Sequence, residues 1–82
     1  MSTVREVVEV LAKALTDHPG QIRVVETEHK GTTLVELYVA ANEVGRVIGK
    51  QGRTAAALRT LAATAGEKLG KTVTLEIRDG RP

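Results

Sequence analysis

The chain contains no cysteine, phenylalanine or tryptophan, and Tyr38 is its one tyrosine. Without cysteine, the chain can form neither a disulfide nor a cysteine-based zinc site. It also lacks a long apolar run, so the sequence predicts no membrane-spanning helix, and its N-terminus shows no secretory signal pattern. We therefore expect a cytoplasmic protein with no membrane partner.

The size of the chain limits its organisation. Its 82 residues leave room for one domain, expected over residues 1–82 with 79–82 as a frayed tail. Hydrophobic residues make up 41% of the chain. Because Phe and Trp are absent, the core must consist of Val, Leu, Ile and Ala side chains. Side chains this small fill space only where helices and strands lie close together.

Hydrophobic periodicity predicts six elements of secondary structure. They are a helix over 4–15, strands over 21–28 and 33–39, a short helix over 43–47, a helix over 53–68 and a strand over 71–78. The two early strands form a hairpin and are antiparallel, whereas a crossover through two helices makes the second and third strands parallel. We predict an α+β fold with a three-stranded mixed sheet, three helices on one face and the other face open.

Alternation and helical spacing also predict which side chains are buried. In the second strand, Val35, Leu37 and Val39 share one face, and we expect this face to be covered. In the helix over 53–68, the spacing of the apolar residues predicts one buried face. Its expected members are Leu58, Leu61, Ala62, Ala65 and Leu69.

Gly49 and Gly52, three residues apart, join the two later helices and form the most informative stretch of the sequence. Glycines can adopt positive φ and leave the main chain uncovered. Lys50 lies inside this turn and Arg53 directly after it. The unpaired amides that begin the next helix add the positive end of a helix dipole. This combination favours close approach of a phosphate.

The distribution of charge supports the same interpretation. The net charge is only +2, but no acidic residue occurs between Glu43 and Glu67. That interval contains four basic residues around the glycine turn. They are Arg46, Lys50, Arg53 and Arg59. A local patch of one sign around an uncovered loop is typical of phosphate contact.

The string Gly45-Arg46-Val47-Ile48-Gly49-Lys50-Gln51-Gly52-Arg53 resembles the KH domain. In that family a Gly-x-x-Gly loop clamps about four nucleotides of RNA or single-stranded DNA. The element order resembles the type II, prokaryotic KH fold. Because the likeness covers essentially the whole chain, the sequence is similar to the small bacterial single-KH proteins of the KhpA family. This resemblance implies RNA binding, together with self-association or pairing with a larger KH-domain-containing RNA-binding protein.

The resemblance and the local sequence define a candidate RNA-binding site. Its residues are Arg46, Val47, Ile48, Gly49, Lys50, Gln51, Gly52 and Arg53. We expect the phosphates to lie against the amides of 49–52. The candidates for the floor of a shallow apolar groove beside the turn are Val47, Ile48, Ala55 and Ala56.

No aromatic residue near the turn can stack on bases. We therefore expect weak binding by one copy and a benefit from linking two, as in a dimer. The role implied by the resemblance is that of a post-transcriptional regulator or RNA chaperone acting with a partner subunit.

Other functions remain as alternatives. His18 and His29 fall in predicted turns, there is no cysteine, and the strand carboxylates have no visible convergent partner. We therefore expect no enzyme, no catalytic residue, no cofactor, no metal ion and no small-molecule substrate. Three binding alternatives are a single-stranded DNA binder, a helix-turn-helix reader of duplex DNA through 53–68, and a protein-interaction module on a KH scaffold.

Overall fold

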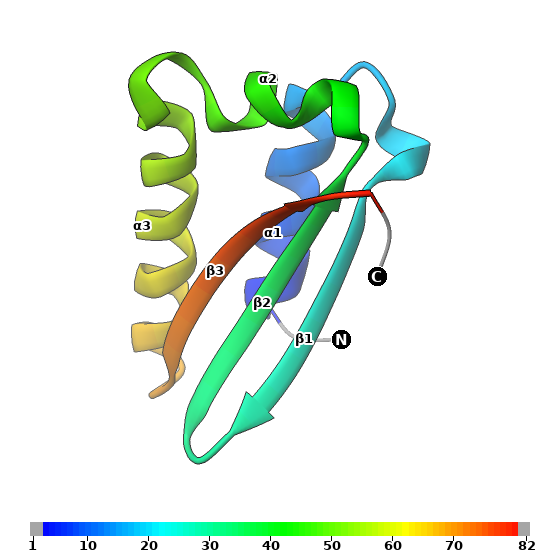
Figure 1. Cartoon of the computed structure of the whole chain (residues 1–82). Helices are drawn as coiled ribbons and strands as arrows, with labels where there is room; N and C mark the ends of the chain where they lie inside the picture. The colour runs from blue at the N-terminus through cyan, green and yellow to red at the C-terminus, as the bar shows by residue number, and fades with distance from the viewer. Residues whose placement is uncertain (1–2, 81–82) are drawn as a thin grey trace.

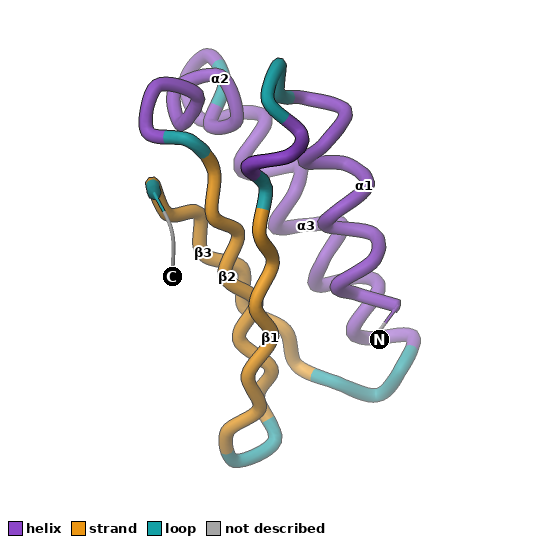
Figure 2. Tube along the Cα trace, turned by 90° about the vertical axis from the view of Figure 1, so that its right-hand side faces the viewer, coloured by secondary structure: helices purple, strands orange, loops and turns teal. Residues whose placement is uncertain are grey.

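A computed structural model describes residues 3–80 and shows a helical layer on one face of a three-stranded sheet, with the other face open (Figures 1 and 2). The elements are α1 (Thr3–Leu15), β1 (Arg23–His29), β2 (Thr32–Val39), α2 (Val44–Ile48), α3 (Arg53–Lys68) and β3 (Thr72–Asp79). Three single 3-10 turns lie at Pro19–Gln21, Ala41–Glu43 and Lys50–Gly52. The predicted element order and α+β class are confirmed.

The strand order is β1-β2-β3, with β2 in the centre. β1 pairs antiparallel with β2, and β3 pairs parallel with β2 over its whole length. Both orientations agree with the sequence-based prediction. Along β2, Val35, Leu37 and Val39 are fully buried, which confirms that this face lies under the helices.

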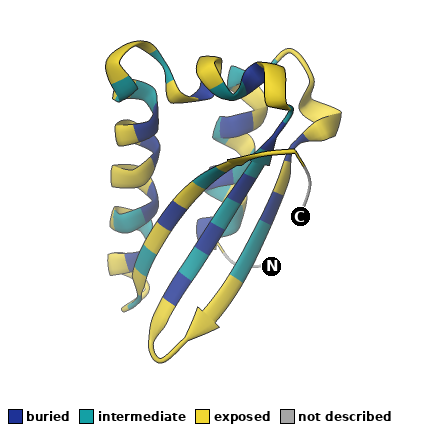
Figure 3. Ribbon diagram, in the orientation of Figure 1, coloured by how far each residue is buried: buried dark blue, intermediate teal, exposed yellow. Residues whose placement is uncertain are grey.

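The core lies between the sheet and the helices, as the dark stripes in Figure 3 show. It contains only Val, Leu, Ile and Ala side chains, as composition predicted. Besides the three residues of β2, its buried members are Val4, Val8, Ala12, Ile22, Val24, Val47, Leu58, Ala62 and Leu75. Helix and sheet approach closely where the side chains are small. A Cβ on Gly66 of α3 would lie 2.4 Å from Cγ2 of Val73 on β3.

Two side chains of the helix over 53–68 are not buried as expected. Leu61 is 47% exposed and Leu69 is 49% exposed. A helix residue lies about 100° around the axis from its neighbour, so the face that points Leu58 and Ala62 at the sheet turns Leu61 away from it. Leu69 follows the last residue of α3 and no longer has helical backbone angles, so it does not continue the buried face of the helix.

Residues 79 and 80, expected to belong to a frayed tail, are instead paired with the sheet. Asp79 belongs to β3 opposite Val39, and the amide of Gly80 donates to the carbonyl of Val39 at 2.8 Å. Residues 81–82 of that expected tail lie outside the described part of the chain. Over residues 3–80, no helix is both long enough and apolar enough to cross a membrane.

Candidate nucleic-acid interface

The glycine turn lies at one end of the molecule, where α2 ends and the chain enters α3 (Figure 1). Gly49 (φ 78°), Gln51 (φ 57°) and Gly52 (φ 71°) have positive φ values. The amide of Gly49 donates to the carbonyl of Gly45 at 2.9 Å and closes α2, while the amide of Gly52 donates to the carbonyl of Gly49 at 3.1 Å. The chain therefore reverses within four residues, using a backbone conformation that favours glycine.

The two glycines have different surroundings. A Cβ on Gly49 would lie 2.3 Å from Oγ1 of Thr54, so Gly49 allows the turn to fold against the first turn of α3. A Cβ on Gly52 would meet no atom within 4 Å. The two glycines therefore differ in the space beside them: Thr54 fills it at Gly49, whereas it is open at Gly52.

Three polar side chains project from this turn. Lys50, Gln51 and Arg53 are all exposed. Within residues 3–80, no carboxylate pairs with Lys50 or Arg53. Over the same residues 3–80, Gln51 is one of two non-glycine residues with positive φ, the other being Lys30 in the hairpin turn. This conformation costs about 1–2 kcal/mol for a residue with a side chain. The turn thus combines unpaired positive charge with a backbone held in an unfavourable conformation.

The other two basic residues of the acid-free interval are bound within the protein. Nη1 of Arg46 lies 2.5 Å from Oδ2 of Asp17, and its Nε lies 3.6 Å from Oε2 of Glu43. Arg59 donates from Nε to the carbonyl oxygen of Leu75 at 3.2 Å. In the described part of the chain, Lys50 and Arg53 at the turn therefore have no carboxylate partner, whereas Arg46 and Arg59 are held by other groups of the protein.

The expected apolar floor is only half present. Val47 is fully buried and Ala55 is 3% exposed, so neither side chain can line a surface groove. Val47 belongs to the hydrophobic core, and Ala55 is one of the buried residues of α3. Ile48, which is 37% exposed, and Ala56, which is also exposed, remain as apolar surface beside the turn.

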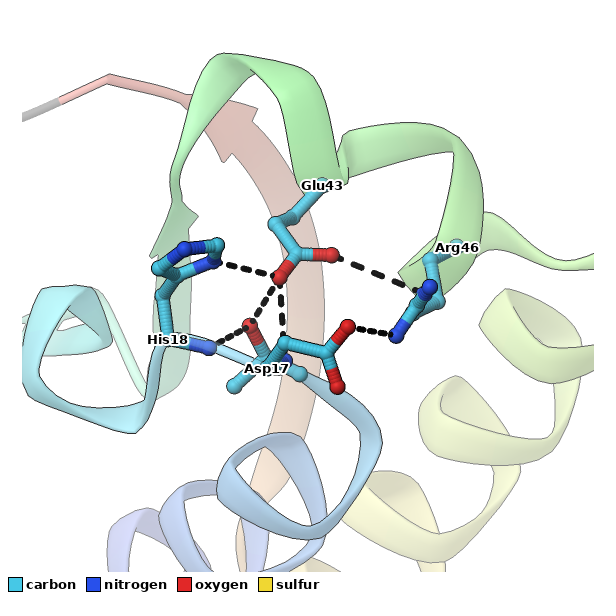
Figure 4. Close-up of polar contacts among 5 residues, drawn as sticks. Asp17, His18, Glu43 and Arg46 are labelled. Atoms are coloured by element: carbon cyan, nitrogen blue, oxygen red, sulfur yellow. Dashed lines mark hydrogen bonds and ion pairs between the residues drawn. The ribbon is translucent and has the colours of Figure 1, made fainter.

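A buried carboxylate next to the turn was not anticipated from the sequence. Glu43 is 4% exposed, and its Oε1 accepts hydrogen bonds from Oγ1 of Thr16 at 3.0 Å and the amide of Asp17 at 2.9 Å. The same oxygen lies 2.8 Å from Nδ1 of His18 (Figure 4). With Arg46, these residues form what we call the Glu43 cluster: Thr16, Asp17, His18, Glu43 and Arg46.

The Glu43 cluster stabilises the ionised form of the Glu43 carboxyl group. The hydrogen bond from His18, above all, lowers the pKa of the Glu43 carboxyl, and the Asp17 amide, the Thr16 hydroxyl and Arg46 act in the same direction. Burial raises that pKa but does not outweigh them. His18, expected to be a surface turn residue, is therefore also a partner of this carboxylate. No side chain caps the start of α2 by a hydrogen bond.

An apolar groove separates α1 from α3. It consists of two hollows of about 480 and 190 Å³ that share Leu11 and Leu61. Its side chains, which define the α1/α3 groove, include Val7, Val10, Leu11, Ala57 and Leu61. Val10 is 68% exposed there.

Residues 3–80 contain no group of three or more His, Asp or Glu side chains that could hold a metal ion.

Comparisons with known proteins agree with this fold. The family model described as "KhpA/KhpB, KH domain" matches residues 5–77. A protein of Aquifex aeolicus named RNA-binding protein KhpA is 49% identical over 77 residues, which cover 94% of this chain and 98% of that protein. A Clostridium perfringens protein of the same name is 42% identical over 73 residues, covering 89% of this chain and 97% of that protein.

Solved structures show the same architecture within a larger protein. Aquifex aeolicus Era Y63A bound to GDP.AlF4- superposes with a TM-score of 0.64 at 25% identity, over 93% of this chain and 29% of the Era chain. Era in complex with MgGDPNP and nucleotides 1506-1542 of 16S ribosomal RNA gives the same values. The present chain thus corresponds to under a third of Era. Because the family model matches residues 5–77 and a relative is 49% identical over 94% of this chain, the chain belongs to the KhpA/KhpB KH domain family.

Proposed function

We propose that the protein binds single-stranded RNA by laying about four nucleotides across the Gly49–Gly52 turn. The observation that carries this proposal is the open space beside the backbone at Gly52, flanked by the exposed Lys50 and Arg53. Relatives at 42–49% identity are named RNA-binding proteins, and Era has been solved with nucleotides of 16S ribosomal RNA. The proposed role is binding, as part of post-transcriptional regulation or RNA chaperoning.

The proposed contacts follow from exposure. Phosphates lie against the backbone of Gly49–Gly52, with charge supplied by Lys50 and Arg53 and a hydrogen bond by Gln51. Bases contact the exposed apolar surface of Ile48 and Ala56. Two further members of the sequence-based candidate set act indirectly: Val47 holds α2 to the core, and Arg46 acts through the Glu43 cluster.

Pairing of two copies through the α1/α3 groove would compensate for the weak grip of a single turn. A two-fold axis beside the groove would set it against the same groove of a second copy. The lining is mainly apolar, so this contact would cover the exposed Val10 and Leu61 side chains of both copies. This self-complementary apolar surface favours a second copy over an unrelated protein. A larger KH-domain-containing RNA-binding protein is the alternative occupant of the same groove.

The double variant Lys50→Asp/Gln51→Asp tests the grip. It keeps both glycines and places two negative charges in the turn, so binding to a mixed pool of fluorescein-labelled single-stranded RNA octamers should weaken roughly tenfold or more. Fluorescence anisotropy measures the affinity. A matched control is His29→Asp/Lys30→Asp in the hairpin turn at the other end of the sheet, which changes the net charge equally.

Equal loss of binding in both double variants would reduce the effect to net charge, and unchanged binding in the turn variant would refute the grip. The same assay with single-stranded DNA and duplex DNA octamers separates the nucleic-acid alternatives. If no nucleic acid binds and only a protein partner does, the chain is an interaction module on the same scaffold.

A further inference from the structure

We propose that Glu43 is a positioning residue for RNA binding: through the Glu43 cluster it fixes α2, and thereby the glycine turn, to the end of α1. This inference rests on the function proposed above, and it assigns Arg46 to the cluster instead of to a phosphate. It concerns how the turn is held, because none of the cluster residues belongs to the turn itself.

The position of Glu43 in the chain gives it this leverage. It directly precedes α2, a helix of five residues, and such a short helix is not stable without tertiary support. The far end of α2 continues into the turn through the bond between the Gly49 amide and the Gly45 carbonyl. Val47 is the one fully buried side chain of α2. Fixing the start of α2 therefore fixes the direction in which the turn is presented.

The geometry at Glu43 is that of a strong anchor. One carboxylate oxygen accepts from three donors, all supplied by Thr16, Asp17 and His18 just after α1 and 25–27 residues away in sequence. A carboxylate has no proton to give, so Nδ1 of His18 must carry the proton in this contact. Hydrogen bonds to an ionised group are shorter and stronger than neutral ones. Figure 4 shows them converging from the end of α1 onto the start of α2.

Arg46 completes the arrangement from the other side. Its guanidinium lies between Oε2 of Glu43 and Oδ2 of Asp17, so the two carboxylates share one cation. The charged and titratable groups that meet here are Asp17 and His18 from the segment after α1, Glu43 from the turn before α2, and Arg46 from α2. A guanidinium held by two carboxylates is poorly placed to contact RNA. Its effect on binding should therefore pass through the position of α2.

The first test uses the sign of the effect. Glu43→Ala removes a negative charge near a proposed RNA site, so electrostatics alone predicts tighter binding. Loss of the anchor predicts weaker binding, by about three- to tenfold in the octamer assay, since a turn that is correctly oriented part of the time binds in proportion to that fraction. Glu67→Ala, an exposed acid at the end of α3, is the control with the same charge change. If Glu43→Ala binds as tightly as Glu67→Ala, the proposal is wrong.

The second test separates positioning from phosphate contact at Arg46. The logarithm of the affinity for single strands falls with the logarithm of the salt concentration, with a slope of about −0.7 per phosphate contact. Arg46→Gln should weaken binding and keep the wild-type slope, whereas Lys50→Gln should make the slope shallower by about 0.7. A slope change at Arg46 equal to that at Lys50 would overturn the assignment, as would unchanged affinity. Arg46 is 54% exposed in its side chain, so this variant should fold even if Glu43→Ala does not.

A third measurement distinguishes local positioning from loss of overall stability. In Glu43→Ala, amide hydrogen exchange measured by NMR should speed up over residues 44–54, while the amides of β2 keep their protection. Uniform loss of protection across α2 and β2 would show a merely structural role. The turn variant Lys50→Asp/Gln51→Asp, run in the same assay, tells which idea fails. If it binds normally, the grip is refuted; if it loses binding while Glu43→Ala does not, only the positioning role is refuted.

Discussion

At the scale of single residues, the two glycines of the Gly-x-x-Gly turn serve separate purposes. Gly49 makes room for Thr54, and Gly52 leaves open space beside the backbone. A methyl group at either position also meets the cost of a positive φ, about 1–2 kcal/mol. Only at Gly49 does it collide with the protein.

The pair of variants Gly49→Ala and Gly52→Ala should therefore behave differently. Gly52→Ala should destabilise the fold by about 1–2 kcal/mol and also weaken RNA binding, because the methyl projects toward the proposed strand. Gly49→Ala should cost about 1–3 kcal/mol more, since the overlap with Thr54 must be relieved. Urea unfolding followed by circular dichroism measures both values. Equal destabilisation would contradict the distinct role given to Thr54.

Sequence reasoning located the turn but not its support. The Gly-x-x-Gly spacing and the acid-free interval are local features, and the exposed Lys50, Gln51 and Arg53 lie where they predicted. Glu43 meets partners 25–27 residues away, and no local pattern in the sequence marks such a contact. The expected roles of Val47 and Ala55 failed for a related reason: which face of a helix is buried depends on the elements that pack against it.

At the scale of elements, the distance between α3 and β3 depends on a glycine that helix propensity alone would disfavour. Gly66 is buried in α3, and a Cβ there would lie 3.1 Å from the carbonyl of Lys71 as well as 2.4 Å from Val73. The glycine turn before it, the alanine-rich run and Gly70 after it predicted the bounds of α3, 53–68, as observed. Alternation likewise gave the faces of β2. Leu61 was misplaced because periodicity does not reveal which flank of a helix a neighbour covers.

Two helical glycines provide the test at this scale. Gly45→Ala in α2 meets open space and should stabilise the fold by about 0.5–1 kcal/mol through helix propensity. Gly66→Ala should destabilise it by about 1–2 kcal/mol, because overpacking against β3 exceeds the same propensity gain. Thermal unfolding of both variants compares them directly. Stabilisation by Gly66→Ala would show that α3 can move away from the sheet at little cost.

At the scale of the whole molecule, the exposed apolar side chains are not spread evenly. Val10 and Leu61 both face the α1/α3 groove, next to the elements that carry the turn. Pairing through this groove would give one assembly two RNA grips. Linked sites bind more tightly than either alone without any new contact to the RNA.

Leu61→Asp should therefore produce a monomer and lower the affinity for long single-stranded RNA by about tenfold or more, while leaving the affinity for octamers nearly unchanged. Leu69→Asp is the matched control, because Leu69 is equally exposed but does not line the groove. Analytical ultracentrifugation gives the oligomeric state. A wild-type monomer, or a dimer that survives Leu61→Asp, would rule out this interface between copies.

The parallel pairing of β3 with β2 has a consequence for the timing of synthesis. β3 is the last strand of the described chain to leave the ribosome, yet it covers one whole edge of β2 and the inner side of α3. A nascent chain that stops before residue 72 has the glycine turn but not the framework beneath it. Capture of a transcript should accordingly begin only after translation has passed the final strand, and truncated products should not compete for RNA.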